Sequence, residues 1–458
     1  MDRAVRLFVL TATALCAALT AGPLPADDPA RGEQPTVTWQ VESSHNVLGT
    51  NDSTFYARIR VKAAAVETKR QPLNLALVFD RSGSMKEEAK IGYLRQAGHL
   101  VVDNLTKPDH VALVAYNHEV QTLAPLHSVV NREYLHHRID ELYADGYTNL
   151  SGGLMEGCAQ LHGRLDQQGL HHVILLTDGL ANRGVTDPGA LVRLVERCTQ
   201  RGISVSTIGV GTEYNEALLS RVADAGGGRY VHVAKPDEIP SAFEKELGAL
   251  LAVVAQNAKL NIGLPAGVEP MQVFGRDEPL KPDKLELTLG DLASGEERVL
   301  LVKFAVRSGA AGSGTLALSG SLTYDDISSA ERIKEEQAVN IERAAAATAE
   351  PGPVLAYARL VEAVDKIALA VQGMDYRLAA EVQQIQRRDF PQLKQVAWSS
   401  RDQDFVNKAF MFEHYARELQ DLIERGALHE HSRQRAALQK ELHYRRYLME
   451  HHRDDHRH

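Results

Sequence analysis

Residues 73–85 of the chain read LNLALVFDRSGSM. The apolar run at their start ends at Asp80, and a turn of small polar residues follows before a predicted helix. The run predicts a strand, and the turn stands at its carboxyl end. In an open sheet of parallel strands, ligands bind in the crevice at the carboxyl ends of the strands. The turn is therefore a candidate binding site if the sheet is of that kind.

The alternation of apolar runs and amphipathic segments continues to about Leu250. The apolar runs are LNLALVF, HVALVAY, HHVILLT, ISVSTIGV and RYVHV. The amphipathic segments are Glu87–Leu105, Arg132–Leu142, Leu154–Leu165, Ala190–Gln200, Asn215–Ala225 and Pro236–Leu251. Runs such as Val173–Leu176 have no polar face, as expected for strands covered by helices on both sides. Repeated strand–helix–strand units predict an α/β domain at residues 72–255, with an open, doubly wound, mostly parallel sheet.

Strand-like sequence flanks this domain on both sides. Before it, within residues 27–71, Thr36–Val41 and Phe55–Val61 alternate and read as antiparallel strands. After it, residues 256–345 hold further strand-like runs, with turns such as Leu289-Gly290-Asp291 between them. The later runs are Lys259–Leu264, Leu285–Leu289, Val299–Val306, Thr315–Tyr324 and Ala338–Ile341. They predict a small antiparallel β-sandwich. If the early strands share its sheet, the α/β domain is inserted in the sandwich; otherwise it precedes it.

The rest of the chain predicts helices. Arg343–Pro353 reads as a linker, and residues 346–425 form a helical region with one helix from Val354 and another around Asp404–Arg425. The end of the chain, residues 426–458, is a polar tail rich in Arg and His. We expect a solvated, partly helical end. The alternative is that its histidines bind a borderline metal such as Zn²⁺ or Ni²⁺.

Two further polar loops follow strand–helix junctions at the edge of the sheet that carries the Asp80 turn. They are residues 146–151 (GYTNLS) and 177–179 (TDG). The predicted fold brings five oxygen-bearing side chains together: Asp80, Ser82, Ser84, Thr148 and Asp178. All five are hard oxygen ligands, which Mg²⁺ or another hard divalent cation such as Mn²⁺ or Ca²⁺ prefers. The loops therefore predict a metal site.

This D-x-S-x-S, Thr, Asp set resembles the metal-ion-dependent adhesion site of von Willebrand factor type A domains, a Rossmann-like fold. Asp80, Ser82 and Ser84, then Thr148, then Asp178 follow the family's order, and the resemblance spans about residues 72–250. The layout is similar to exported bacterial proteins described as resembling calcium-activated chloride-channel or inter-alpha-trypsin-inhibitor heavy-chain proteins. The resemblance implies a cation with one open position, which an Asp or Glu of a partner protein fills.

Each of these residues also has a purely structural interpretation. Asp80 and Ser82 could cap the following helix, because their side chains accept hydrogen bonds from free backbone donors there. Asp178, before Gly179, could be a turn residue. Three matching loops together favour the metal site over these separate explanations.

The favoured function is non-enzymatic, metal-dependent binding of a protein partner. The alternative is a metal-dependent hydrolase that uses the same ion, a chemistry that needs a general base or a nucleophile near the open position. The sequence contains no H-E-x-x-H and no G-x-S-x-G motif, and no acidic pair at the loops beyond Asp80 and Asp178. A channel subunit is disfavoured, because no apolar run reaches the length of a membrane-spanning helix.

Composition and the first residues bound the remaining possibilities. Lys plus Arg is 51 and Asp plus Glu is 60, a net charge of −9, which argues against nucleic-acid binding through a basic surface.

Residues 1–26 predict a secretory signal peptide, because two arginines precede an apolar stretch of about fifteen residues. The predicted location is the periplasm or the cell exterior; lipidation of Cys16 is disfavoured because Leu15 before it is large. Cys158 and Cys198 form either two buried free thiols, the favoured interpretation, or a disulfide.

Overall fold

The computed structural model of the chain describes residues 35–45, 47–49, 53–66, 70–165, 169–276, 280–307, 314–344 and 353–450. From Thr36 on, these residues belong to one compact unit. The predicted signal peptide at residues 1–26 and the last residues of the tail, 451–458, lie outside the described residues. Within the described residues, no helix is both long enough and apolar enough to cross a membrane.

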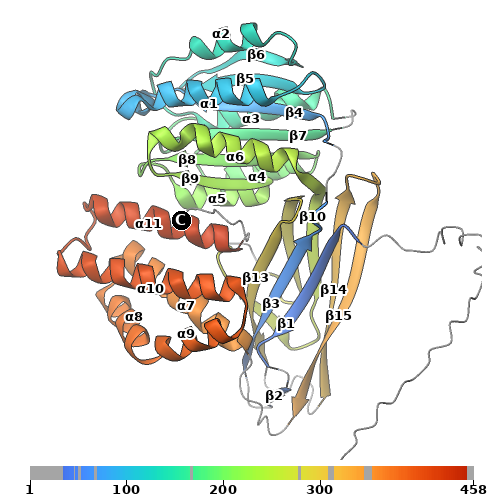
Figure 1. Cartoon of the computed structure of the whole chain (residues 1–458), viewed down its shortest axis with the longest axis vertical. Coiled ribbons are helices and arrows are strands. Elements are labelled where there is room, and N and C mark those ends of the chain that lie inside the picture. The colour runs from blue at the N-terminus through green and yellow to red at the C-terminus, as the bar shows by residue number, and fades with distance from the viewer. Residues whose placement is uncertain are drawn as a thin grey trace, which may run out of the picture. The chain divides into compact units, whose positions relative to one another are not determined.

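A six-stranded sheet forms the α/β part (Figure 1). In spatial order its strands are β6 (Val120–Ser128), β5 (His110–Tyr116), β4 (Leu73–Asp80), β7 (Leu170–Thr177), β8 (Ile203–Val210) and β9 (Gly227–Val233). Neighbouring strands are parallel except β5 and β6, which are antiparallel. The predicted open, mostly parallel sheet is confirmed. The sequence does not predict β6. Its residues, VQTLAPLHS, include a proline and do not alternate regularly between apolar and polar side chains.

Helices cover both faces of this sheet, so that β4, β7 and β8 are buried along their whole length. On one face lie α1 (Lys90–Asn104), α2 (Arg132–Asp140) and α6 (Ile239–Leu251). On the other lie α3 (Leu150–His162), α4 (Pro188–Thr199) and α5 (Glu216–Ala225). Cys158 and Cys198, in α3 and α4, are buried and free, so the favoured interpretation of this pair is confirmed.

The sandwich has two antiparallel sheets, and it contains strands from both sides of the α/β part. The first sheet is β1 (Val37–Ser43), β3 (Thr54–Ala63), β13 (Glu297–Val306) and β11 (Val268–Val273). The second is β12 (Lys284–Ala293), β10 (Val253–Gly263), β14 (Gly314–Asp326), β15 (Arg332–Ala344) and β2 (Val47–Gly49). β2 pairs with β15 in parallel, an exception in the second sheet. Because β3 lies directly beside β13, the α/β part is inserted in the sandwich.

Gly290 lies inside β12, so the prediction of a turn at residues 289–291 is wrong. Its φ is +71°, and a Cβ at this position would lie 2.1 Å from the carbonyl oxygen of Gly227 in β9. Only glycine permits this close approach between the backbones of the sandwich and the α/β part. The sequence signal of a turn therefore marks a junction between the two parts.

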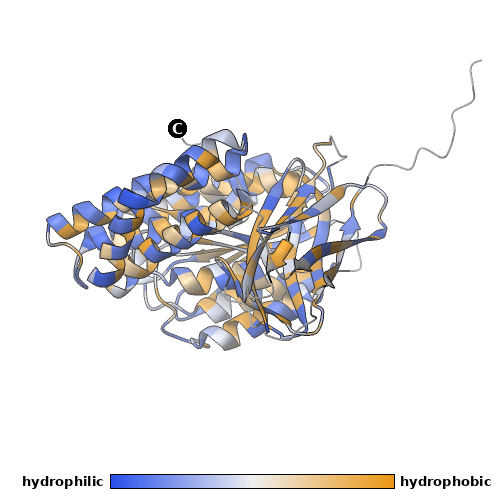
Figure 2. Cartoon of the chain, turned by 90° about the horizontal axis from the view of Figure 1, so that it is seen from below, coloured by the Kyte–Doolittle hydropathy of each residue, from blue (hydrophilic) through white to orange (hydrophobic). Residues whose placement is uncertain are grey.

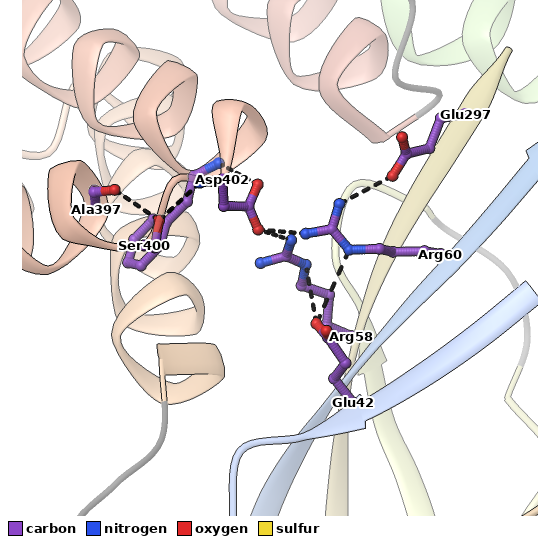
Figure 3. A network of polar contacts seen from close by, with 8 residues as sticks. Glu42, Arg58, Arg60, Glu297, Ala397, Ser400 and Asp402 are labelled. Atoms are coloured by element: carbon purple, nitrogen blue, oxygen red, sulfur yellow. Dashed lines mark hydrogen bonds and ion pairs between the residues drawn. The ribbon is translucent and has the colours of Figure 1, made fainter. Parts of the chain in front are cut away.

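The helical region packs on the outer face of the sheet that contains β3 and β13. Its helices are α7 (Pro353–Gly373), α8 (Tyr376–Arg388), α9 (Phe390–Ser399), α10 (Gln403–Glu424) and α11 (Arg433–Glu450). An ion-pair network fixes the start of α10 to this sheet (Figure 3): the side chain of Asp402 caps α10 and accepts hydrogen bonds from Arg58 and Arg60 of β3. Arg60 also donates to Glu297 of β13, at 2.9 Å.

The prediction of a solvated end for residues 426–458 is wrong for the described part of the tail. Helix α11 packs against α5 and β9 of the α/β part as well as against α7 and α10 (Figure 1). Tyr444, Tyr447 and Leu448 join the core between the sheet and α3–α5. Figure 2 shows that hydrophilic positions dominate the helices near the C-terminus mark, and this polar composition hides the few apolar positions that dock the helix.

Candidate functional site

Three loops meet at the carboxyl edge of the central sheet. Asp80 ends β4, and Asp178 directly follows β7, the parallel neighbour of β4. The third loop precedes α3, which begins at Leu150 rather than at the predicted Leu154 because the side chain of Asn149 caps it. Backbone hydrogen bonds tie this loop to the Asp80 turn: Gly83 N donates to Gly146 O at 3.0 Å. A side-chain bond from Asn182 ties it to the Asp178 loop, because Thr148 N donates to Asn182 Oδ1 at 2.9 Å.

The loops bring the predicted hydroxyl groups beside the second carboxylate. Ser84 Oγ donates to Asp178 Oδ1 at 2.6 Å, and Ser82 Oγ lies 3.2 Å from Ser84 Oγ. A Cβ on Gly179 would lie 3.6 Å from Thr148 Oγ1 and 3.7 Å from Ser84 Oγ. The Thr148 and Ser84 hydroxyl groups therefore approach the same point next to Asp178.

Asp80 lies at the floor of the site and is fully buried. Its Oδ1 accepts the backbone N–H of Ser82 at 2.8 Å, and its Oδ2 accepts the hydroxyl of Thr177 at 2.7 Å. Burial, and next the charge of Asp178, raise the pKa of Asp80 to about 6. The two carboxylates thus repel each other, and a cation between them would relieve this repulsion.

The alternative interpretation, that these residues only cap a helix or stabilise a turn, holds in part. Asp80 does accept a local backbone hydrogen bond, from Ser82. The side chain of Ser82 makes no capping hydrogen bond to the following helix. The carboxylate of Asp178 bonds to side chains from other segments rather than stabilising its own turn.

Lys90 also belongs to the site, although its position there is not predicted from the sequence. Its Nζ donates to Asp178 Oδ2 at 2.7 Å, and the side chain is buried. The residues before it explain its position: Glu88 and Ala89 have φ of +51° and +57°, so the regular helix begins only at Lys90.

These residues fit a hard divalent cation on the chemistry of their donors. The five predicted side chains offer only oxygen, and two of them are carboxylates. Four are buried and Ser84 is half-buried, so the site faces solvent mainly at Ser84. Asp80, Asp178 and Lys90 sum to a charge of −1, which leaves the site attractive to a cation.

Large aromatic, apolar and cationic side chains lie on two of the loops that form the site. Tyr147, next to Thr148, is 56% exposed, and Leu180, two residues after Asp178, is 57% exposed. The guanidinium of Arg183 stacks over the Tyr147 ring, 4.3 Å from its centroid. Exposed Tyr and Arg side chains are enriched where proteins bind one another. We refer to Tyr147, Leu180 and Arg183 as the rim.

The fold and part of the sequence are similar to those of known proteins. The chain is 29% identical over 259 residues to YfbK of Escherichia coli, covering 54% of this chain and 45% of YfbK. It is 23% identical over 249 residues to inter-alpha-trypsin inhibitor heavy chain H2 of Sus scrofa, covering 50% of this chain and 26% of that protein. The chain thus spans about half or less of the length of these two relatives.

A solved structure, the von Willebrand factor type A protein from Catenulispora acidiphila, superposes with a TM-score of 0.62 at 17% identity. The superposition covers 80% of this chain and 90% of that chain, so the likeness of fold extends beyond the α/β part. The family profile "von Willebrand factor type A domain" matches residues 74–245, which contain the five predicted site residues. Domains of this family generally mediate protein–protein interactions. Residues 74–245 of this chain are a von Willebrand factor type A domain.

Proposed function

We propose that this protein binds a partner protein through a divalent cation held by Asp80, Ser82, Ser84, Thr148 and Asp178, with an Asp or Glu of the partner completing the site. The observation that carries the proposal is the convergence of the loops. Ser84 Oγ lies 2.6 Å from Asp178 Oδ1, and the hydroxyl oxygens of Thr148 and Ser84 both lie within 3.7 Å of the position that a Cβ on Gly179 would take. Mg²⁺ is the first choice of ion, and Mn²⁺ or Ca²⁺ would use the same oxygen ligands.

The charges around the site favour an acidic partner. With Lys90 included, the protein supplies −1, so a dication held there leaves a net charge of +1 in a largely buried place. The bound ion would supply an electrophilic centre, and Lys90 prevents the two carboxylates from neutralising it fully. A carboxylate is the side chain that best compensates this charge. The rim would then add apolar and aromatic contacts around it.

Two groups next to Asp80 do not favour the hydrolase alternative. The Lys90 ammonium is bonded to Asp178, and the Tyr116 hydroxyl donates to Leu176 O at 3.0 Å. Burial raises the pKa of Tyr116 well above its usual value of 10, so it is a poor general base. We therefore propose a binding role without catalysis. That the protein is exported is likewise a proposal, and it rests on the sequence of residues 1–26.

Capture of the partner tests this function. Immobilised protein is incubated with exported and membrane fractions of its source in Mg²⁺, and the column is then washed with EDTA. We expect a protein that EDTA elutes, that Thr148→Ala does not retain, and that no longer binds once its carboxyl groups are amidated. Thr315→Ala, which alters an exposed residue of β14 in the sandwich, should retain the partner like the wild type. Equal retention by Thr148→Ala with the same sensitivity to EDTA would refute the proposal.

A further inference from the structure

A second cluster of ionisable side chains lies between α1 and α2, apart from the three loops. His99 and Asp103 are four residues apart on α1, and His136 and Asp140 are four residues apart on α2. Each ring bonds to the carboxylate of the other helix. His99 Nε2 lies 3.0 Å from Asp140 Oδ1, and His136 Nε2 lies 3.0 Å from Asp103 Oδ1.

The remaining ring nitrogens face each other. His99 Nδ1 and His136 Nδ1 are 2.6 Å apart, while the ring centroids are 4.8 Å apart. The two nitrogens therefore lie between the rings and point at one another. Both side chains are about 30% exposed, so solvent reaches the pair.

Two neutral imidazoles do not carry enough protons to satisfy all the hydrogen bonds of this arrangement. Ionised carboxylates only accept hydrogen bonds, so Asp103 and Asp140 require a proton on each Nε2. A neutral imidazole carries one ring proton, and both Nδ1 atoms are then left with lone pairs directed at each other. Two lone pairs at 2.6 Å repel unless a proton or a metal cation lies between them. The pair thus calls for a positive centre that both nitrogens can bind.

We propose that His99 and His136 form a two-histidine site for a divalent transition metal of the Zn²⁺ class. Imidazole nitrogen is a preferred ligand of such ions, and a ligating histidine generally donates its other N–H to a carboxylate, as both rings do here. Zinc–nitrogen bonds of about 2.0–2.1 Å require the two nitrogens to part by less than about 1 Å, which these partly exposed rings achieve by rotation. Among the described residues, no group of three or more His, Cys, Asp or Glu is placed to hold a metal ion. Water therefore completes the coordination, and the ion would link α1 to α2.

Zinc binding to the full chain, measured by calorimetry in saturating Mg²⁺, tests this site. Wild type, His99→Gln, His136→Gln and His137→Gln are compared, so that zinc bound by the histidines of the tail is common to all four proteins. His137 is the matched control, because it lies on α2 with its side chain 73% exposed and paired with Glu141. We expect wild type and His137→Gln to bind one more Zn²⁺ than His99→Gln and His136→Gln, and Zn²⁺ to raise the melting temperature of the first two only.

The two aspartates provide a second test that a change in folding would not mimic. Asp103→Asn and Asp140→Asn keep the shape of the side chain but weaken the acceptor of the Nε2–H. We expect each to lower the zinc affinity about 10–100-fold while the melting temperature in EDTA stays unchanged. If the wild type and the three histidine variants bound the same number of Zn²⁺ ions, the proposal would be overturned. A proton shared between the two rings would then explain why their nitrogens lie so close.

Discussion

We expect Asp80→Asn to have a higher free energy of unfolding than the wild type in EDTA at pH 7, although it removes a predicted metal ligand. The pKa of Asp80 is raised from 3.8 to about 6, first by burial and then by Asp178. A carboxyl whose folded pKa exceeds its unfolded pKa binds more protons in the folded state. The stability of the metal-free protein therefore falls as the pH rises from about 4 to about 6. A shift of two pKa units corresponds to about 3 kcal/mol of stability that the wild type loses when Asp80 ionises. The asparagine variant does not lose it, because its side chain stays neutral.

In Mg²⁺ we expect the difference in stability between Asp80→Asn and the wild type to disappear. An ion that binds only the folded state stabilises it by about 2.7 kcal/mol at one hundred times its dissociation constant. We expect this gain in the wild type and none in Asp80→Asn, and we expect the advantage of the variant in EDTA to vanish as the pH falls to about 4. Denaturant unfolding across pH, with EDTA or Mg²⁺, measures both effects.

Asp291 in β12 supplies the matched control for this experiment. Burial also raises its pKa to about 6, but its carboxylate bonds to Ser204 at 2.8 Å, and it is not one of the loop residues. Asp291→Asn should keep the full response to Mg²⁺. If Mg²⁺ stabilised Asp80→Asn as much as the wild type, the assignment of Asp80 as a ligand would be wrong.

The second large effect is expected where α11 docks. Lys440 Nζ donates to Glu216 of α5 and to the carbonyl oxygen of Tyr214, and it lies 4.4 Å from the centroid of the Tyr214 ring. Burial alone would raise the pKa of Glu216, but the charge of Lys440 outweighs it and lowers that pKa. Lys440→Met leaves the Glu216 carboxylate without its cation in a largely buried place. We expect a loss of about 3–5 kcal/mol.

Hydrogen exchange locates this loss, and two further variants control for it. The backbone N–H of Tyr230 in β9 donates to the hydroxyl of Tyr447 in α11 at 2.9 Å, so its exchange should accelerate when α11 detaches. Adding Glu216→Gln to Lys440→Met should recover part of the stability, because the unpaired charge is removed. Lys366→Met breaks an exposed pair with Glu381 and should cost less than about 1 kcal/mol. A similarly small loss in Lys440→Met would mean that α11 is not held by this ion pair.

The sequence predicts the elements whose signals are local. Apolar runs without a polar face identify β4, β7 and β8, and the polar residues that follow them identify the Asp80 and Asp178 loops. Strand alternation after residue 256 likewise predicts the sandwich. These signals suffice because each depends on the spacing of neighbouring residues and on where a strand ends.

The features that the sequence does not predict depend on contacts between distant segments. Lys90 joins the site only because the chain bends at Glu88 and Ala89. Gly290 resembles a turn glycine in the sequence. The structure shows that a glycine is needed there because the backbone of Gly227 lies against it. In α11, Tyr447 directly follows Arg445 and Arg446, so this end of the helix resembles a solvated one until its contact with Tyr230 is known.

Equilibrium binding of Mn²⁺, followed by electron paramagnetic resonance with Mg²⁺ as competitor, measures whether a cation binds at the three loops. We expect one Mn²⁺ per wild-type chain that Mg²⁺ displaces, and we expect Asp178→Asn but not Asp291→Asn to lose it. If Asp178→Asn still bound a Mn²⁺ that Mg²⁺ displaces, and bound it with wild-type affinity, the three loops would not be the cation site.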